Sequence, residues 1–146
     1  MRLKKKQKNI IGNLFQAANR LQSIGNNVSR EISFKQWLAL ITLFNDSHKP
    51  LSLNDIASKL CVSRQSVRKM IDILERKGYV TITDSDVDNR AYLITYTERS
   101  EKEFDKYKED IFETLDKIFA DINEKEMDIF EDIIKKILRN MENEFK

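Results

Sequence analysis

A run of polar and basic residues between positions 63 and 76 has the types and the spacing that suit contact with DNA. Serine, glutamine, arginine and lysine donate hydrogen bonds to base edges and to phosphates. At about 100° per residue, one helix face of this run consists of Gln65, Arg68, Lys69, Asp72 and Arg76. A solvated helix presents the same kind of face, so the hypothesis depends on the neighbouring elements.

Local signals predict the helix that carries this run. Ser63 is a good N-cap, and Gly78 is suited to end the helix in a left-handed conformation. Residues at helical spacing form an apolar stripe, which consists of Val67, Met70, Ile71 and Leu74.

Two preceding helices are predicted to support it. Ser52 and Asp55 form a capping-box pattern, and Ser33 and Gln36 form another at the start of residues 33–45. Helices this short are not stable alone, so we expect the three to pack as a helix-turn-helix unit. The core candidates of the first helix are Trp37, Leu38, Leu40, Ile41 and Phe44.

A β-hairpin is predicted directly after this unit. Residues 80–83 and 91–96 are rich in β-branched and aromatic residues with period-two alternation, and turn-forming residues lie at 84–89. Arg90 follows the turn and could reach a minor groove, with Asp86 or Asp88 holding its guanidinium. An Asp–Arg pair that merely closes the hairpin is the alternative, and both interpretations can hold together.

Four segments in this order resemble the MarR (multiple antibiotic resistance regulator) family of winged-helix transcription factors: ISFKQWLALITLF, LSLNDIASKLCVSRQSVRKMIDILERKGYV, DVDNRAY and TERSEK. With helical flanks on both sides, the resemblance covers nearly the whole chain. It implies a mainly α fold with a small β-hairpin wing, in which the helix after the turn enters the major groove and the wing arginine probes the minor groove. The DNA-binding candidates are Ser63, Arg64, Gln65, Ser66, Arg68, Lys69, Asp88 and Arg90.

Three positions depart from the pattern of this family. Cys61 and Ser100 stand where glycine is common, and Asn89 stands where a basic residue is common. The Asn89 departure removes one expected cation from the wing.

Charge is distributed unevenly along the chain. Residues 1–97 carry 16 Lys and Arg against 8 Asp and Glu, whereas residues 98–146 carry 10 against 16. A basic part that holds the predicted DNA-binding helix is thus joined to an acidic helical part, as expected for a protein that meets DNA with one side. Chance in a charge-rich chain is the alternative explanation.

Apolar stripes outside the helix-turn-helix unit predict a homodimer. A helix is expected at residues 6–24, and two more are expected within 98–145 with a break near 121–124. Because the unit is too small to cover these stripes, we expect segments 1–32 and 98–146 to form dimerisation helices around a DNA-binding region at 33–97 in a single domain. An intramolecular bundle in a monomer is the rival arrangement.

Composition argues against several other classes of protein. One Cys and one His argue against a disulfide framework and a zinc site, and no catalytic constellation, metal set or cofactor motif accompanies the acidic residues. With no apolar run near 18 residues and no apolar region behind the basic N-terminus, we expect a cytoplasmic protein that spans no membrane. A bacterial source follows only from the resemblance.

The sequence therefore predicts a homodimeric repressor that binds double-stranded DNA and that a small-molecule effector could release. A winged-helix module for protein contacts and a redox-responsive regulator using Cys61 are the alternatives. Cys61 is also explained as a small packed residue, His48 as a turn residue, and the basic run at residues 2–8 as a disordered arm that could touch phosphates.

Overall fold

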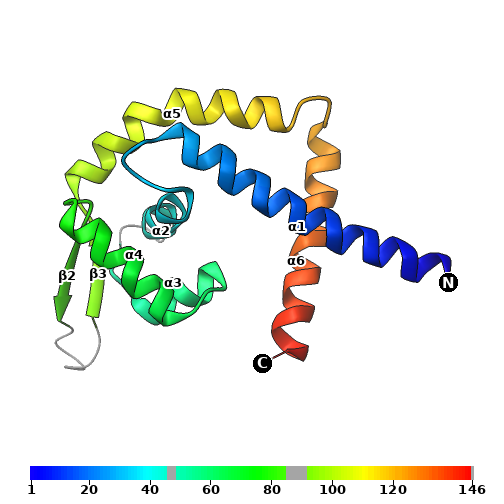
Figure 1. Ribbon diagram of the computed structural model, residues 1–146, viewed down its shortest axis with the longest axis horizontal. Coiled ribbons are helices and arrows are strands. Elements are labelled where there is room, and N and C mark those ends of the chain that lie inside the picture. Colours follow the sequence, from blue (N-terminus) through cyan, green and yellow to red (C-terminus); the bar gives the residue numbers. More distant parts are fainter. Residues whose placement is uncertain (46–48, 85–91, 146) are drawn as a thin grey trace. The chain divides into compact units, whose positions relative to one another are not determined.

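The computed structural model describes residues 1–45, 49–84 and 92–145 (Figure 1). Their helices are α1 (Arg2–Val28), α2 (Phe34–Asn45), α3 (Leu53–Leu60), α4 (Arg64–Arg76), α5 (Glu98–Ile118) and α6 (Glu124–Glu144). The strands β1 (Leu51–Ser52), β2 (Val80–Asp84) and β3 (Tyr92–Tyr96) form one antiparallel sheet in the order β1-β3-β2. The predicted mainly α fold with a β-hairpin wing is confirmed.

The chain divides into two compact units, Met1–Glu109 and Asp110–Lys146. The first contains α1 to α4, the sheet and the beginning of α5, and the second contains the rest of α5 and α6. The functional division at 1–32, 33–97 and 98–146 stays a prediction.

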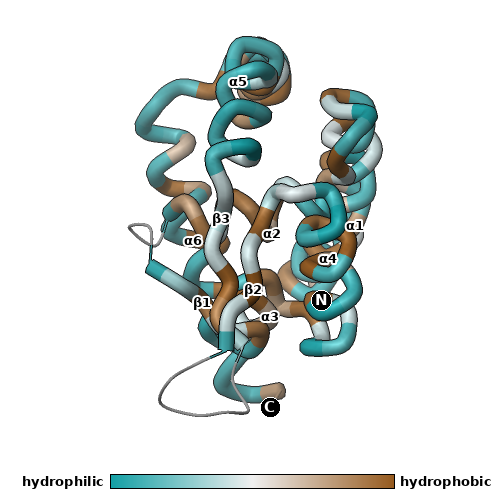
Figure 2. The backbone as a smooth tube through the Cα atoms, turned by 90° about the vertical axis from the view of Figure 1, so that its left-hand side faces the viewer, coloured by the Kyte–Doolittle hydropathy of each residue, from teal (hydrophilic) through white to brown (hydrophobic). Residues whose placement is uncertain are grey.

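The core of the first unit lies where α2, α3, α4 and the sheet meet. Figure 2 shows hydrophobic (brown) segments in α2 and in the strands. Of the expected core residues of α2, Trp37 and Leu40 are buried, but Leu38, Ile41 and Phe44 are only partly buried. Ala39 and Leu43, which were not expected, are fully buried because α2 packs against α1, α3, α4 and β3 at once. Other fully buried side chains include Ile56, Val67, Ile71, Leu74, Tyr79 and Ile94.

The predicted helix caps are confirmed. Ser33 and Gln36 exchange hydrogen bonds between side chain and backbone, and Ser52 and Asp55 form the capping box of α3. Gly78 has φ +81° after α4, and the N–H of Tyr79 donates to the carbonyl of Leu74 at 2.9 Å. This left-handed turn closes α4 and leads the chain into β2.

Ser100, one of the three departures from the family pattern, joins the hairpin to α5. Its buried hydroxyl accepts from the N–H of Thr97 at 3.0 Å and donates to the Thr97 carbonyl at 2.7 Å. The Thr97 hydroxyl in turn donates to the carbonyl of Gly78 at 2.7 Å. The hydroxyl that glycine lacks therefore holds the backbone of Thr97 at the start of α5, and the Thr97 side chain makes the link to the end of α4.

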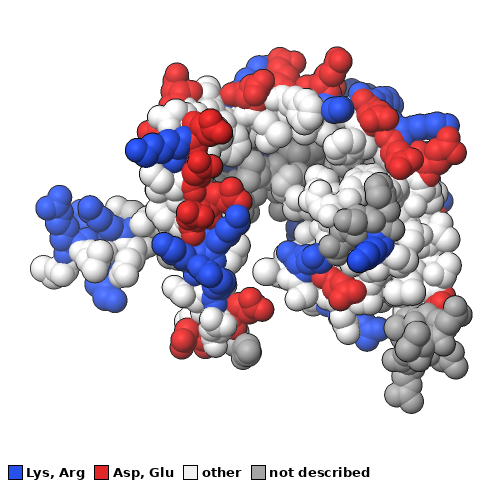
Figure 3. Space-filling view, turned by 180° about the vertical axis from the view of Figure 1, so that it is seen from behind, with Lys and Arg blue, Asp and Glu red and all other residues white. Residues whose placement is uncertain are grey.

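Helix α1 is longer than the sequence predicted. It starts at Arg2, so the basic run is the first two turns of this helix and not a separate disordered arm. Lys and Arg gather at this end of α1 in Figure 3. No side chain of α1 is buried within the chain, and its exposed apolar residues are Leu3, Ile10, Ile11, Phe15, Leu21 and Ile24.

The break between α5 and α6 lies where it was predicted. Asp121 has φ +63°, and Asn123 begins α6 in a capping box with Glu126. Helix α6 buries none of its side chains within the chain, and its exposed apolar residues are Met127, Ile129, Phe130, Ile133, Leu138 and Met141.

None of the helices in the described ranges combines the length and apolar composition needed to cross a bilayer. In the same ranges no three His, Cys, Asp or Glu side chains lie close enough together to hold a metal ion.

Candidate nucleic-acid interface

Helix α4 presents the polar face that the sequence predicted. Val67, Ile71 and Leu74 are buried in the core and fix the rotation of the helix about its axis. The opposite face is therefore held toward solvent. Exposed on it or at its start are Ser63, Arg64, Gln65, Ser66, Lys69 and Arg76.

The two serines at the start of α4 bond to each other. The Ser63 hydroxyl accepts from the N–H of Ser66 at 3.1 Å and donates to the Ser66 hydroxyl oxygen at 2.9 Å. Its single proton is thereby used, whereas the proton of the Ser66 hydroxyl remains able to donate. Ser63 thus caps α4, and its part in DNA contact stays a prediction.

Arg68 lies on the side of α4 nearest the hairpin. Its Nε is 3.1 Å from Asp72 Oδ1, and its guanidinium carbon lies 4.9 Å from the ring centroid of Tyr92 in β3. The sequence placed Arg68 and Asp72 on one helix face but gave no sign of Tyr92, because that contact joins residues from different elements. Arg68 is thus a predicted site residue whose guanidinium has contacts to two other residues of the site, Asp72 on its own helix and Tyr92 in the hairpin.

The hairpin stands beside α4, and its register is fully paired from Val80 opposite Tyr96 to Asp84 opposite Tyr92 (Figure 1). Ile82 and Ile94 face each other within it, and Ile94 is fully buried. Asp88 and Arg90 lie outside the described residues, as do Asp86, Asn89 and His48. The wing pair therefore stays a prediction.

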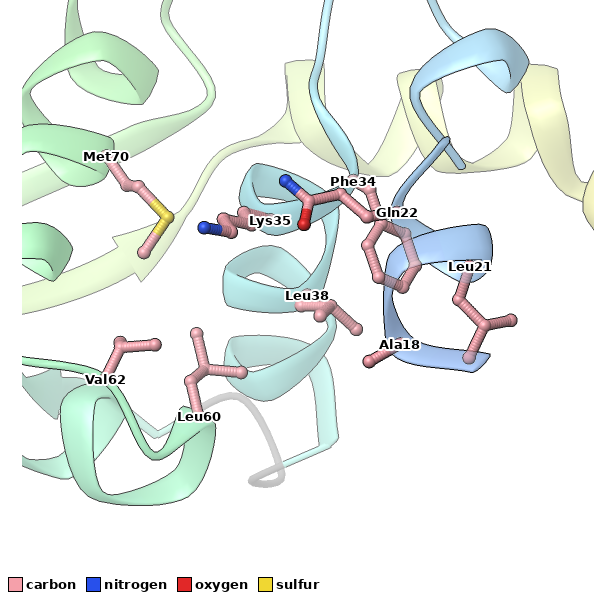
Figure 4. Close-up of a pocket in the computed structure, with 9 residues that line it drawn as sticks. All are labelled: Ala18, Leu21, Gln22, Phe34, Lys35, Leu38, Leu60, Val62 and Met70. Carbon is pink, nitrogen blue, oxygen red and sulfur yellow. The ribbon is translucent and has the colours of Figure 1, made fainter. Parts of the chain in front are cut away.

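A cavity of about 350 Å³ lies between α1, α2 and the helix-turn-helix. Figure 4 shows the polar ends of Gln22 and Lys35 directed into it, while Leu60, Val62 and Met70 line the side toward α3 and α4. The remaining lining residues are Ala18, Leu21, Phe34 and Leu38. The cavity is thus mainly apolar, with one amide and one ammonium group.

Trp37, Phe15 and Tyr107 are large aromatic residues of this unit, but they do not line this cavity. Trp37 is buried, and its ring meets those of Phe104 and Tyr107 edge-on, with centroids 5.9 and 6.3 Å away. Phe15 is 69% exposed on α1. Core packing accounts for Trp37 and Tyr107.

Cys61 occupies the corner between α3 and α4. It is exposed and left-handed, with φ 53° and ψ 42°, and its N–H and that of Val62 donate to carbonyls of α3. Glycine adopts this conformation without strain, which explains why glycine suits the position.

Comparison with protein families matches the MarR family to residues 32–92. The HTH-type transcriptional regulator PrsX of Escherichia coli is 32% identical over 114 residues, which are 77% of this chain and 68% of PrsX. The transcriptional activatory protein BadR of Rhodopseudomonas palustris is 32% identical over 87 residues, covering 58% of this chain and 50% of BadR.

Solved structures share the fold over most of the chain. A MarR/EmrR family transcriptional regulator from Acinetobacter sp. ADP1 superposes with a TM-score of 0.81 at 19% identity, covering 94% of this chain and 97% of that one. Reduced AbfR bound to DNA superposes with a TM-score of 0.76 at 19% identity, covering 97% and 99%. At these identities the likeness concerns the fold.

Proposed function

The chain belongs to the MarR family of DNA-binding transcriptional regulators, and from this premise we propose that it is a homodimeric repressor of a pseudo-palindromic operator. The observation that carries the proposal is the polar face of α4, which is held outward by its buried stripe and lies beside the hairpin. A capped helix with exposed cations next to a two-stranded ribbon can enter one groove while the ribbon approaches the next.

In this proposal α4 lies in the major groove of each half-site. Arg64, Gln65, Ser66, Arg68 and Lys69 contact bases and phosphates, and Ser63 accepts a hydrogen bond while it caps the helix. Asp88 orients Arg90, which enters the adjacent minor groove. A structure of AbfR bound to DNA has the same fold, which supports DNA as the partner of this chain.

The dimer is proposed because both flanking helices leave apolar side chains uncovered. Phe15 of α1 is 69% exposed and Phe130 of α6 is 56% exposed. Several large apolar side chains exposed along one helix mark an interaction site, and a twofold dimer covers the same surface on both copies. Such a dimer also presents two copies of α4 to half-sites about one DNA turn apart.

Release by an effector is proposed for the cavity between α1, α2 and the helix-turn-helix. Its lining favours a mainly apolar molecule with an acidic or hydrogen-bonding end that meets Gln22 and Lys35. A molecule bound there contacts α1 and Met70 of α4 at once. Because half-site spacing is fixed, moving α4 relative to the dimer helices lowers DNA affinity.

Selection of duplexes from a randomised pool tests the proposal. The expected result is an enriched inverted repeat that the protein protects as a dimer, and repression of a reporter whose promoter contains that repeat. Enrichment of no sequence, or protection of single half-sites by a monomer, would reject the dimeric repressor.

A further inference from the structure

The Arg68 side chain is held from two directions. Asp72 meets its Nε at 3.1 Å one helical turn further along α4, and the Tyr92 ring of β3 lies 4.9 Å from its guanidinium carbon. The Arg68 and Asp72 side chains are 41% and 45% exposed. The guanidinium is thus fixed at the edge of the proposed DNA surface without being buried away from a ligand.

Within the part of the chain that the structure describes, this geometry leaves the terminal nitrogens of Arg68 available. Among the described residues, the ion pair with Asp72 is made through Nε and the Tyr92 ring lies against the guanidinium carbon, and neither contact is made through Nη1 or Nη2. These two nitrogens carry four N–H donors in one plane. Two parallel hydrogen bonds from such a plane match O6 and N7 of guanine in the major groove.

Stability alone does not account for Asp72 at this position. An exposed ion pair four residues apart on a helix adds little to folding, and a carboxylate on a DNA-binding face repels phosphates. The same carboxylate becomes useful if it keeps Arg68 in one orientation before DNA arrives. Arginine otherwise loses much rotamer freedom on binding, which lowers affinity.

We propose that Asp72 and Tyr92 are positioning residues for DNA recognition, which together preorganise Arg68 to read a guanine. The inference rests on the proposed role of α4 in the major groove. Tyr92 is paired with Asp84 across the hairpin, so its contact with Arg68 also ties the hairpin to α4. The two proposed DNA-contacting elements are thereby held in register.

The test is the Asp72→Asn variant on two duplexes, the one that the wild-type protein selects from a randomised pool and a scrambled duplex of the same composition. Loss of preorganisation should weaken binding to the selected duplex about three- to tenfold, as expected for one side chain that must be ordered on binding. Binding to the scrambled duplex should stay equal or strengthen, because a negative charge has been removed.

Glu75→Gln is the matched control, because it removes the same charge from an exposed residue on the same helix. It should leave the ratio of the affinities for the selected and the scrambled duplex unchanged. Tyr92→Phe, which keeps the ring, should behave as wild type, whereas Tyr92→Leu should lower the ratio as Asp72→Asn does. Thermal unfolding of each variant identifies any that fail to fold.

The outcomes separate this inference from the proposed function. If the wild-type protein selects no sequence, the proposed function fails first. If it selects a sequence and Asp72→Asn binds both duplexes at least as tightly as wild type, Asp72 is an ordinary solvated acid and the inference is wrong. Equal weakening on both duplexes also overturns it, because a positioning residue for base reading must change their ratio.

Discussion

At the scale of single residues, Cys61 has a backbone conformation that residues other than glycine rarely adopt. Its φ of 53° and ψ of 42° place a side chain with a Cβ in the left-handed region, which destabilises a residue by about 1–2 kcal/mol. Glycine escapes this strain but loses about 0.5–1 kcal/mol more through the entropy of the unfolded chain. We therefore expect Cys61→Gly to raise the free energy of unfolding by about 0.5–1 kcal/mol, measured by urea denaturation.

Cys61→Ala is the control for this substitution, because it removes the thiol and keeps the Cβ. It should give no gain in stability. A gain of the same size in both variants would assign the effect to the thiol instead of the backbone.

The predicted role of Arg90 in the minor groove is tested by measuring DNA affinity as a function of salt concentration. If it enters a minor groove, Arg90→Ala should weaken binding to every duplex and lower the slope of log affinity against log salt by about one for each arginine in contact. Arg20→Ala removes an equal charge from an exposed position of α1 and should leave both quantities unchanged. Unchanged affinity of Arg90→Ala across the salt titration would refute the wing assignment.

The sequence predicted the caps at Ser33, Ser52 and Ser63 because a cap depends on residues three positions apart. It also placed Arg68 on the exposed face of α4, since helical periodicity is local. The contact between Arg68 and Tyr92 could not be predicted in this way. It depends on how the hairpin packs beside α4, which the pattern within either segment does not determine.

At the scale of elements, two glycines of α1 should respond oppositely to alanine. A Cβ on Gly25 would lie 2.3 Å from Phe34 Cδ2 and 2.9 Å from Phe34 Cβ, whereas a Cβ on Gly12 meets nothing within 4 Å. The N–H of Phe34 donates to the Asn26 side chain at 2.8 Å, so this part of α2 is tied to α1. Gly25→Ala should therefore destabilise the protein by about 1–3 kcal/mol.

Gly12→Ala is the matched control in the same helix. It should stabilise the protein by about 0.5–1 kcal/mol, because alanine restricts the unfolded chain and favours the helix. Urea denaturation tests both substitutions. The free energies of unfolding can be compared when the variants share the same slope of that energy against urea concentration. If Gly25→Ala is also stabilising, α1 and α2 do not approach each other as closely as described.

Element boundaries were predictable where the signal lay within the element. The break near residues 121–124 and the end of α4 at Gly78 are of this kind. Strand β1 has two residues and pairs with β3 more than 40 positions later, so no periodicity within it could indicate a strand. The start of α1 at Arg2 was missed because a run of like charges favours an extended, solvated chain.

At the scale of the whole molecule, the apolar surfaces of α1 and α6 predict how the protein assembles. Phe15 is 69% exposed, and burying one phenylalanine contributes about 1.5–3 kcal/mol. In a twofold interface each substitution acts twice, so Phe15→Glu should weaken the dimer at least 100-fold. Light scattering coupled to gel filtration over a range of concentrations measures this change.

Loss of the dimer should also weaken DNA binding, since two linked copies of α4 bind two half-sites far more tightly than one copy binds one. Asn13→Glu, an exposed polar position of the same helix, should leave both the dimer and its affinity for an inverted repeat unchanged. Raising the Phe15→Glu concentration should restore protection of the full repeat, because α4 itself is intact. If Phe15→Glu remains dimeric, α1 does not contribute its apolar face to the interface, and the dimer must be formed by other surfaces.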